Sequence, residues 1–210
     1  MLRKETVSPD LIYVLEKLMH FKSLREFRLV GGTALAFQLG HRVSVDIDLF
    51  ASSPFDIEEV KKEIEDTFLI STAEKESRWG LRYWIKGVKA EMYNWDIPFI
   101  KPSIIENGIR MTSLEDIGAM KLDAIKSRHE KKDFVDIHEI LKSFSLEELF
   151  QFYSTKYRNP ELRSVIEALT NIDKADNSID PEILIDMQWV DVKSTIKNAL
   201  KKFIDSDRKK

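Results

Sequence analysis

The sequence contains no cysteine, which excludes disulfide bridges and metal sites built from thiolates. It has no apolar run long enough to cross a bilayer, and its first residues, MLRKETVSPDL, lack the apolar core of a signal peptide. An excess of positive charge is missing too, because 33 lysines and arginines are offset by 36 aspartates and glutamates. We therefore expect a cytoplasmic globular protein without membrane contact and without a uniformly basic surface for nucleic acid.

The remaining composition is typical of a folded domain. The 210 residues are 43% hydrophobic and 33% charged, which is enough to bury a sizeable core in one domain or two small ones. One local basic segment, KLDAIKSRHEKK, covers residues 121–132. A solvated helix face explains such a run as well as a binding patch does.

Glycine is scarce, yet three of the seven glycines fall within the first ten residues of GGTALAFQLGHRVSVDIDLF (31–50). Gly31 and Gly32 lie between a predicted strand (27–30) and a predicted short helix (33–39). Glycines at such a junction let the backbone approach a ligand closely, and the N–H groups of the helix start can bind phosphate. A tight strand-to-helix turn is the alternative interpretation.

Two aspartates follow on a strand predicted over residues 44–50. At a spacing of two residues, the side chains of Asp46 and Asp48 point to the same face, about 7 Å apart. Like charges beside an apolar core are unfavourable unless a cation or solvent compensates them. Mg²⁺ prefers oxygen ligands and bridges carboxylates to phosphates, so it is the predicted cofactor, with Mn²⁺ as the alternative. Two incidental acids on a solvent-facing strand would give the same short pattern.

A third carboxylate lies in the segment LRYWIKGVKAEMYNW (81–95), which is predicted to form two strands around a turn. Lys89, Glu91 and Tyr93 share one face of the second strand. If this strand neighbours the aspartate strand, Glu91 can join the metal ligands and help deprotonate an attacking hydroxyl. An exposed strand glutamate is an equally good interpretation of the spacing alone.

The two halves of the chain differ in their patterns. Strands and helices mix up to about residue 110, whereas the rest reads as helical. We therefore predict an α+β protein with domains at residues 1–110 and 111–210. Besides a helix that Ser8 and Pro9 begin and one that Asp56 caps, the predicted helices cover residues 114–129, 133–143, 145–157, 160–170 and 190–205, with a polar linker at 171–182.

The stretch GGTALAFQLGHRVSVDIDLF resembles the signature of the AbiEii/AbiGii-type nucleotidyltransferases, a toxin-related branch of the DNA polymerase β-like superfamily. The segment DIGAMKLDAIKSRHEKKDFVDIHEIL (116–141) is similar to a second conserved region of that family, a lysine-bearing helix followed by Lys-Asp-x-x-Asp. The resemblance covers about residues 28–141. It implies a polymerase β-like nucleotidyltransferase core with a mixed sheet, followed by a C-terminal helical domain.

The resemblance also implies roles for individual residues. The glycine turn would hold a triphosphate, the paired aspartates would bind Mg²⁺, and residues of the second region would complete the site. Glu91 stands where such enzymes more usually have an aspartate. The candidate catalytic residues are Asp46, Asp48, Glu91, Lys121, Asp133 and Asp136. The candidate nucleotide-binding residues are Gly31, Gly32, Thr33, Arg42, Ser44, Lys121 and Arg128, and for Arg42 a surface salt bridge is the alternative. The candidate metal ligands are Asp46, Asp48 and Glu91.

The activity that the resemblance implies is metal-dependent transfer of a nucleoside monophosphate from a nucleoside triphosphate to an acceptor hydroxyl. The expected acceptor is tRNA, another RNA end or a protein, and the expected setting is a toxin–antitoxin or abortive-infection system with a cognate antitoxin. Two other functions fit parts of the pattern. A glycosyltransferase also uses D-x-D to hold a metal, and a non-catalytic module for binding nucleotides or partners can retain the fold.

Overall fold

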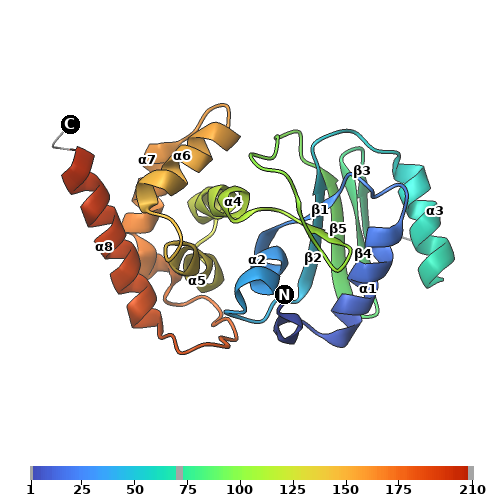
Figure 1. Cartoon of the computed structure of the whole chain (residues 1–210), viewed down its shortest axis with the longest axis horizontal. Helices are drawn as coiled ribbons and strands as arrows, with labels where there is room; N and C mark the ends of the chain where they lie inside the picture. The colour runs from blue at the N-terminus through green and yellow to red at the C-terminus, as the bar shows by residue number, and fades with distance from the viewer. Residues whose placement is uncertain (1, 70–72, 208–210) are drawn as a thin grey trace. The chain divides into compact units, whose positions relative to one another are not determined.

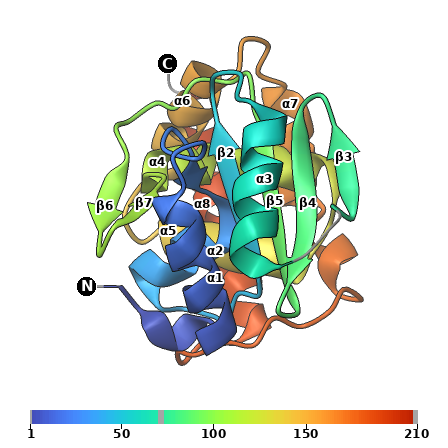
Figure 2. The same ribbon diagram turned by 90° about the vertical axis from the view of Figure 1, so that its right-hand side faces the viewer.

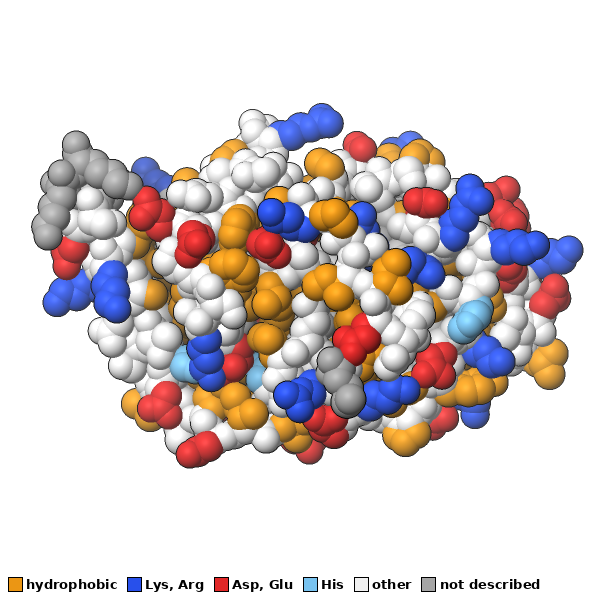
Figure 3. Space-filling view, in the orientation of Figure 1, with side chains coloured by type: hydrophobic (Ala, Val, Ile, Leu, Met, Phe, Trp, Pro, Cys, Tyr) orange, Lys and Arg blue, Asp and Glu red, His pale blue; other side chains and the backbone are white. Residues whose placement is uncertain are grey.

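The computed structural model describes residues 2–69 and 73–207 of the chain (Figure 1). The chain divides into two compact units, Met1–Ser113 and Leu114–Lys210, called here the sheet unit and the helical unit. Within the described ranges, no helix combines the length and the apolar character that a membrane span requires. Acidic and basic side chains are interspersed on the face drawn in Figure 3, in keeping with a net charge of −3.

The strands of the sheet unit are β1 (Arg28–Leu29), β2 (Asp46–Ala51), β3 (Lys75–Ser77), β4 (Gly80–Ile85), β5 (Val88–Asn94), β6 (Ile104–Glu106) and β7 (Ile109–Met111). They form one seven-stranded sheet in the order β3-β4-β5-β2-β1-β7-β6. The sheet is mixed, because β2 runs parallel to β5 and antiparallel to β1. The fourth and fifth strands form the hairpin predicted at residues 81–95.

Helices α1 (Pro9–His20) and α3 (Ile57–Phe68) lie across one face of this sheet (Figure 2). Alternation along β2 and β5 directs Ile47, Leu49, Ala90 and Met92 to the sheet's apolar face, where each is fully buried. Removing these side chains from water stabilises the sheet by about 1.5–3 kcal/mol for each large aliphatic residue. The same alternation directs Asp46, Asp48, Lys89 and Glu91 to the opposite face, followed by Phe50 and Tyr93.

Both covering helices begin where the sequence predicts. The hydroxyl of Ser8 accepts a hydrogen bond from the Leu11 N–H at 3.1 Å, and Pro9 occupies the first turn of α1. Asp56 accepts hydrogen bonds from the backbone N–H groups of Glu58 and Glu59 at the start of α3. These caps satisfy backbone donors that the first helical turn leaves without an intrahelical partner.

The helical unit consists of α4 (Leu114–Ser127), α5 (Lys131–Ile140), α6 (Leu146–Lys156), α7 (Leu162–Thr170), the 3₁₀ turn η2 (Ile172–Ala175) and α8 (Trp189–Asp207). Helix α4 packs against α5, α6 and α7, and α8 also contacts these three helices. Apolar side chains such as Leu122, Ile125 and Leu149 fill the core. A buried ion pair joins Lys156 Nζ to Asp116 Oδ1 at 2.7 Å, so α6 and α4 are also linked by charge.

The α+β class and the mixed sheet predicted from the sequence are confirmed, but some local predictions are wrong. Strand β2 begins at Asp46 rather than at residue 44, and the preceding Val45 is 68% exposed. The predicted linker at 171–182 contains η2. Strands β3, β6 and β7 were not predicted, because three residues are too few for an alternating pattern to be recognised. The predicted domain boundary at residues 110 and 111 stays a prediction.

Candidate active site

The paired aspartates lie at the start of β2, on the polar face of the sheet. The side chain of Asp46 is 35% exposed, and Asp48 is likewise half-buried. Between them, Ile47 points to the opposite face and is fully buried. The buried residues therefore fix the strand, and the strand fixes both carboxylates on a face that a ligand can reach.

Helix α2 (Gly31–Leu39) begins directly beside this strand. The Val30 N–H donates a hydrogen bond to the Asp48 carbonyl oxygen at 2.9 Å, which ties the helix start to β2. Gly31 has a φ of +68°, a conformation that favours glycine. A Cβ at this position would lie 3.3 Å from Asp48 Oδ2. Glycine at position 31 thus lets a carboxylate stand next to the positive end of a helix.

The second glycine makes room for an arginine. A Cβ on Gly32 would lie 2.5 Å from Arg42 Nη2 and 3.4 Å from Ser44 Oγ. Arg42 is only 4% exposed, so its guanidinium lies inside the sheet unit rather than at the surface. Its Nη1 donates to the Val43 carbonyl oxygen at 2.9 Å, which helps to hold the guanidinium beside the helix start.

Thr33 joins the helix start to the segment before β2. Its hydroxyl lies 2.8 Å from the Ser44 hydroxyl and also donates to the carbonyl oxygen of Asp46. Both hydroxyl residues are buried. Six predicted residues of the first conserved segment therefore gather around the start of α2, namely Gly31, Gly32, Thr33, Arg42, Ser44 and Asp48, and Asp46 stands on the same strand face as Asp48.

Glu91 reaches this cluster because β5 pairs with β2 in parallel, with Asp48 directly opposite Glu91. Its carboxylate already has a cationic partner: Arg82 Nε and Nη2 lie 2.7 and 2.6 Å from Glu91 Oε1. The neighbouring strand β4 supplies this arginine, since Arg82 pairs with Glu91 in the register. Sequence reasoning gave Arg82 no role, and its place in a predicted strand was the only signal.

Lys89 lies between two of the carboxylates. Its Nζ is 3.2 Å from Asp46 Oδ2 and 3.5 Å from Glu91 Oε2. Burial by itself would lower the pKa of Lys89, but the attraction of Asp46, Glu91 and Asp48 outweighs burial and raises that pKa above its ordinary value. Lys89 is therefore an ammonium at neutral pH. Alternation correctly placed it on the face of Glu91, but the contact with Asp46 depends on the strand register.

Among residues 2–69 and 73–207, no group of three or more histidine, aspartate or glutamate side chains is arranged to hold a metal ion. The carboxylates of Asp46, Asp48 and Glu91 share one face, but Lys89 and Arg82 stand among them. Any divalent cation at this face needs further ligands, such as phosphate oxygens, and meets an ammonium in its surroundings.

The predicted residues of the second conserved segment come together within the helical unit. Lys121 Nζ lies 2.8 Å from Asp133 Oδ1 and 2.5 Å from Asp136 Oδ2, and all three side chains are buried. Arg128 adds a second cation, with Nε 2.8 Å from Asp133 Oδ2. The family resemblance, not the spacing, grouped Lys121 with Asp133 and Asp136, and it did not indicate that Lys121 is buried between the two carboxylates. Their catalytic roles stay a prediction.

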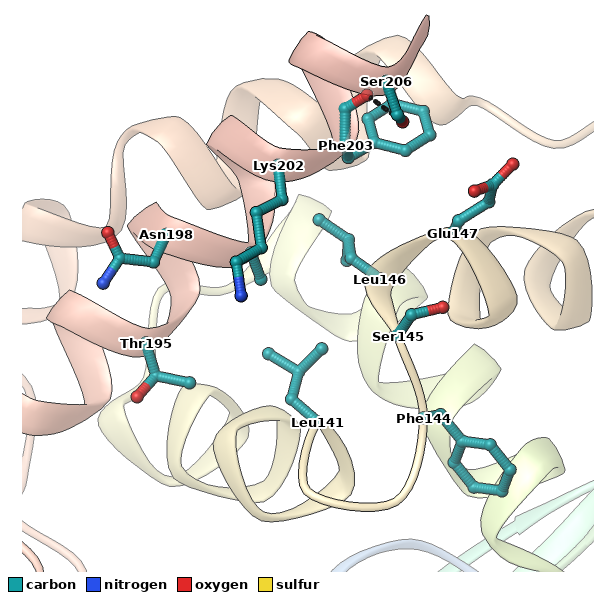
Figure 4. Close-up of a pocket in the computed structure, with 11 residues that line it drawn as sticks. Leu141, Phe144, Ser145, Leu146, Glu147, Thr195, Asn198, Lys202, Phe203 and Ser206 are labelled. Carbon is teal, nitrogen blue, oxygen red and sulfur yellow. Dashed lines mark hydrogen bonds between the residues drawn. The ribbon is translucent and has the colours of Figure 1, made fainter.

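The helical unit also contains a pocket of about 550 Å³ between α8 and the start of α6 (Figure 4). Asn198 and Lys202 extend from α8 across from Leu141 and Leu146. The residues that line this pocket include none of the predicted site residues. The convergence of predicted residues on the start of α2, rather than the size of a pocket, identifies the candidate active site.

The chain resembles several known proteins along most of its length. A protein of Aquifex aeolicus (strain VF5), aq_aa25, is 28% identical over 198 residues, which cover 91% of this chain and 95% of that protein. The crystal structure of JHP933 from Helicobacter pylori matches with a TM-score of 0.53 and 18% identity, over 95% of this chain and 92% of that one. The structure of the nucleotidyltransferase toxin MenT4 of Mycobacterium tuberculosis matches with a TM-score of 0.52 and 12% identity, over 90% of this chain and 81% of that one. At these identities the structural matches show the fold.

The family is shown by a match to the sequence pattern described as nucleotidyl transferase AbiEii toxin, type IV toxin–antitoxin system, over residues 13–78 and 94–209. These segments include the glycine turn and both aspartates of β2. They also include Lys121, Asp133 and Asp136 of the helical unit. Arg82, Lys89 and Glu91 lie between the matched segments. Because the match covers most of the chain, and because the fold agrees with it, this protein is a nucleotidyltransferase of the AbiEii toxin family.

Proposed function

We propose that the protein transfers a nucleoside monophosphate from a nucleoside triphosphate to a hydroxyl group of RNA, and that this reaction is metal-dependent and toxic to the cell. One observation carries the proposal: the start of α2 lies beside the carboxylates of β2. A Cβ built on Gly31 would lie only 3.3 Å from Asp48 Oδ2. Backbone donors for phosphate and oxygen ligands for a cation thus stand side by side.

The start of α2 supports phosphate binding. Backbone N–H groups at a helix N-terminus point outward and attract anions, and Val30, the residue before the helix, has no polar side chain to occupy them. Arg42 brings a buried guanidinium close to Gly32. Thr33 and Ser44 hold the adjoining backbone in place through their hydroxyl contact. We assign the triphosphate to these residues.

Asp46 and Asp48 are the residues we assign to Mg²⁺, with Mn²⁺ as the alternative. Their carboxylates fit a site of the kind in which one or two protein carboxylates bind the ion and substrate phosphates complete its coordination. When bound, such an ion neutralises charge on the phosphates and lowers the pKa of a bound hydroxyl. Glu91 is the third candidate ligand and the candidate acceptor for the hydroxyl proton. Its ion pair with Arg82 orients the carboxylate from the side of β4.

In the proposed reaction, the acceptor oxygen forms a bond to the α-phosphorus and the bond from that phosphorus to pyrophosphate breaks. The hydroxyl proton passes to a carboxylate of the cluster. The expected acceptor is a tRNA or another RNA end, as the resemblance to the family implies, and a protein hydroxyl is the alternative. We further propose that the protein acts in the cytoplasm and that a cognate antitoxin regulates it, since the family is described as part of a type IV toxin–antitoxin system.

The activity can be tested by incubating the purified protein with Mg²⁺ and each α-³²P-labelled nucleoside triphosphate in turn, with total RNA or total protein as acceptor. We expect label on RNA in the size range of tRNA, and none when Mg²⁺ is removed with a chelator. Label on protein alone would show that the acceptor is a protein hydroxyl and not RNA. Triphosphate binding without transfer to any acceptor would contradict the proposal and support a non-catalytic binding module.

The glycine turn gives a second test. In Gly32→Ala the new Cβ must displace Arg42, so triphosphate affinity should fall by about 10-fold or more, the loss of roughly one charge-assisted hydrogen bond. The free energy of unfolding should change by only about 1 kcal/mol, because the end of a flexible side chain can move. Calorimetric titration with a non-hydrolysable triphosphate and urea unfolding measure the two quantities.

Gly87→Asn is the matched control for the Gly32 variant. Unlike Gly32, Gly87 has a positive φ, and no side chain or backbone atom lies within 4 Å of a Cβ built on it. Asparagine tolerates this conformation, so triphosphate binding should stay the same. If the Gly32 variant and the parent bound the triphosphate with equal affinity, the glycine pair would form a structural turn without a role in phosphate binding.

A further inference from the structure

Lys89 occupies an unusual position for a cation in a site that is proposed to bind metal. Its ammonium lies within 3.2 Å of Asp46 and 3.5 Å of Glu91, two of the three candidate metal ligands. The lysine side chain is 25% exposed, so it lies at the margin of the polar face rather than in the core. A part-exposed lysine can change its partner without unfolding the strand that bears it.

The charges around Lys89 explain why it is held there. Parallel pairing of β2 and β5 puts Lys89 directly opposite Asp46 and puts Glu91 directly opposite Asp48. Three carboxylates on neighbouring positions of one face repel one another when no cation compensates them. Lys89 and Arg82 supply that compensation from the protein itself. The cluster is therefore neutralised in part before any divalent cation arrives.

A resident ammonium has consequences for metal binding. A divalent cation that binds Asp46 must compete with Lys89 for the carboxylate and is repelled by the nearby positive charge. A triphosphate changes this balance, because its oxygens provide further metal ligands and an alternative anionic partner for the ammonium. The lysine ammonium is compact and flexible, which suits such an exchange of partners.

We propose that Lys89 is a built-in counter-cation of the carboxylate cluster, and that it makes divalent metal binding depend on the triphosphate. The inference rests on the proposed assignment of Asp46 and Asp48 as metal ligands. In the free protein Lys89 forms ion pairs with Asp46 and Glu91 and so weakens the binding of a divalent metal ion that arrives without the triphosphate. With the triphosphate present, the ammonium turns to phosphate oxygens and Asp46 becomes available. Lys89 is thus a positioning residue that orders the binding of the two ligands.

The test measures Mn²⁺ binding to the purified full chain by the loss of the free-ion signal in electron paramagnetic resonance, without any nucleotide. We expect Lys89→Met to bind Mn²⁺ about 10- to 100-fold more tightly than the parent, because the competing charge is gone. Adding Asp48→Asn to Lys89→Met should remove this gain. A second readout is thermal unfolding, in which Mg²⁺ alone should raise the Tm of Lys89→Met but not that of the parent.

Two further variants control for the removal of a lysine. Lys89→Arg keeps the charge and should bind Mn²⁺ like the parent. Lys86→Met removes a 53% exposed lysine of the same hairpin, which pairs with Asp10 at 3.7 Å, and should also match the parent. Circular dichroism verifies that every variant is folded.

The possible results separate this inference from the proposed function. If Lys89→Met and the parent bind Mn²⁺ equally without nucleotide, while both bind it with a non-hydrolysable triphosphate, the role of Lys89 is wrong and the metal site stands. If neither binds Mn²⁺ even with the triphosphate, both the role of Lys89 and the assignment of the metal ligands are wrong.

Discussion

Asp48→Asn should reduce nucleotide transfer by on the order of 10³-fold while leaving the fold intact. Asparagine keeps the shape of the side chain but removes the negative charge that would bind Mg²⁺, and the magnitude follows from other preorganised charge contacts in active sites. The fold should survive because Ile47 and Leu49, which are fully buried, hold β2 in place. Steady-state transfer of labelled nucleotide to RNA measures the loss.

Ligand-dependent stability provides an independent measurement on the same variant. Mg²⁺ with a non-hydrolysable triphosphate should raise the Tm of the parent, because a ligand that binds only the folded state stabilises it by mass action. The double variant with Asp46→Asn and Asp48→Asn should lose this shift. Asp96→Asn is the control, since Asp96 is an exposed carboxylate beyond the end of β5. Parent-like activity and the same Tm shift in the double variant would remove both aspartates from the site.

Much of the site could be predicted because its features are local in the sequence. Alternation identified the shared face of Asp46 and Asp48, and the structure shows the same alternation with Ile47 buried between them. The glycine pair indicated a tight junction between strand and helix, and Gly31 has a positive φ there, whereas its approach to a ligand stays a prediction. Side-chain caps at Ser8 and Asp56 fixed the starts of two helices. Periodicity and capping depend on neighbouring residues only, so a single sequence reveals them.

The contacts that could not be predicted depend on register and burial. Lys89 meets Asp46, and Arg82 meets Glu91, only because three strands align with particular residues opposite one another. A shift of one residue would have turned every one of these side chains to the other face. Burial of Lys121 was also hidden, since the spacing of a helix shows which face a residue occupies but not what covers that face.

Lys121→Met should lower the free energy of unfolding by about 3–5 kcal/mol, because it removes one partner of a buried ion-pair cluster. The Lys121 ammonium lies within hydrogen-bond distance of Asp133 and Asp136, and all three side chains are buried. Methionine fills similar volume but leaves two carboxylates together with one cation fewer. Urea unfolding at neutral pH measures the change.

Neutralising the carboxylates should recover part of this loss. The triple variant with Lys121→Met, Asp133→Asn and Asp136→Asn contains no uncompensated buried charge, so it should be more stable than Lys121→Met alone. Lys132→Met is the control on α5, because Lys132 pairs with Glu130 at the surface, where the side chains are 42% and 40% exposed. An exposed pair contributes at most about 1 kcal/mol.

Acid should diminish the effect of losing Lys121. Burial alone would raise the pKa of Asp133, but the attraction of Lys121 and the hydrogen bond from Arg128 outweigh burial and hold that pKa below its usual value. A lowered carboxyl pKa stabilises the fold above the unfolded-state value of about 3.9, and this contribution disappears as the pH falls through the folded-state value. The stability difference between the parent and Lys121→Met should therefore be largest at neutral pH and shrink below about pH 4. If Lys121→Met instead kept the stability of the parent at neutral pH and lost nucleotide transfer, this prediction would be wrong. Lys121 would then contact the substrate and would not mainly compensate the charges of Asp133 and Asp136.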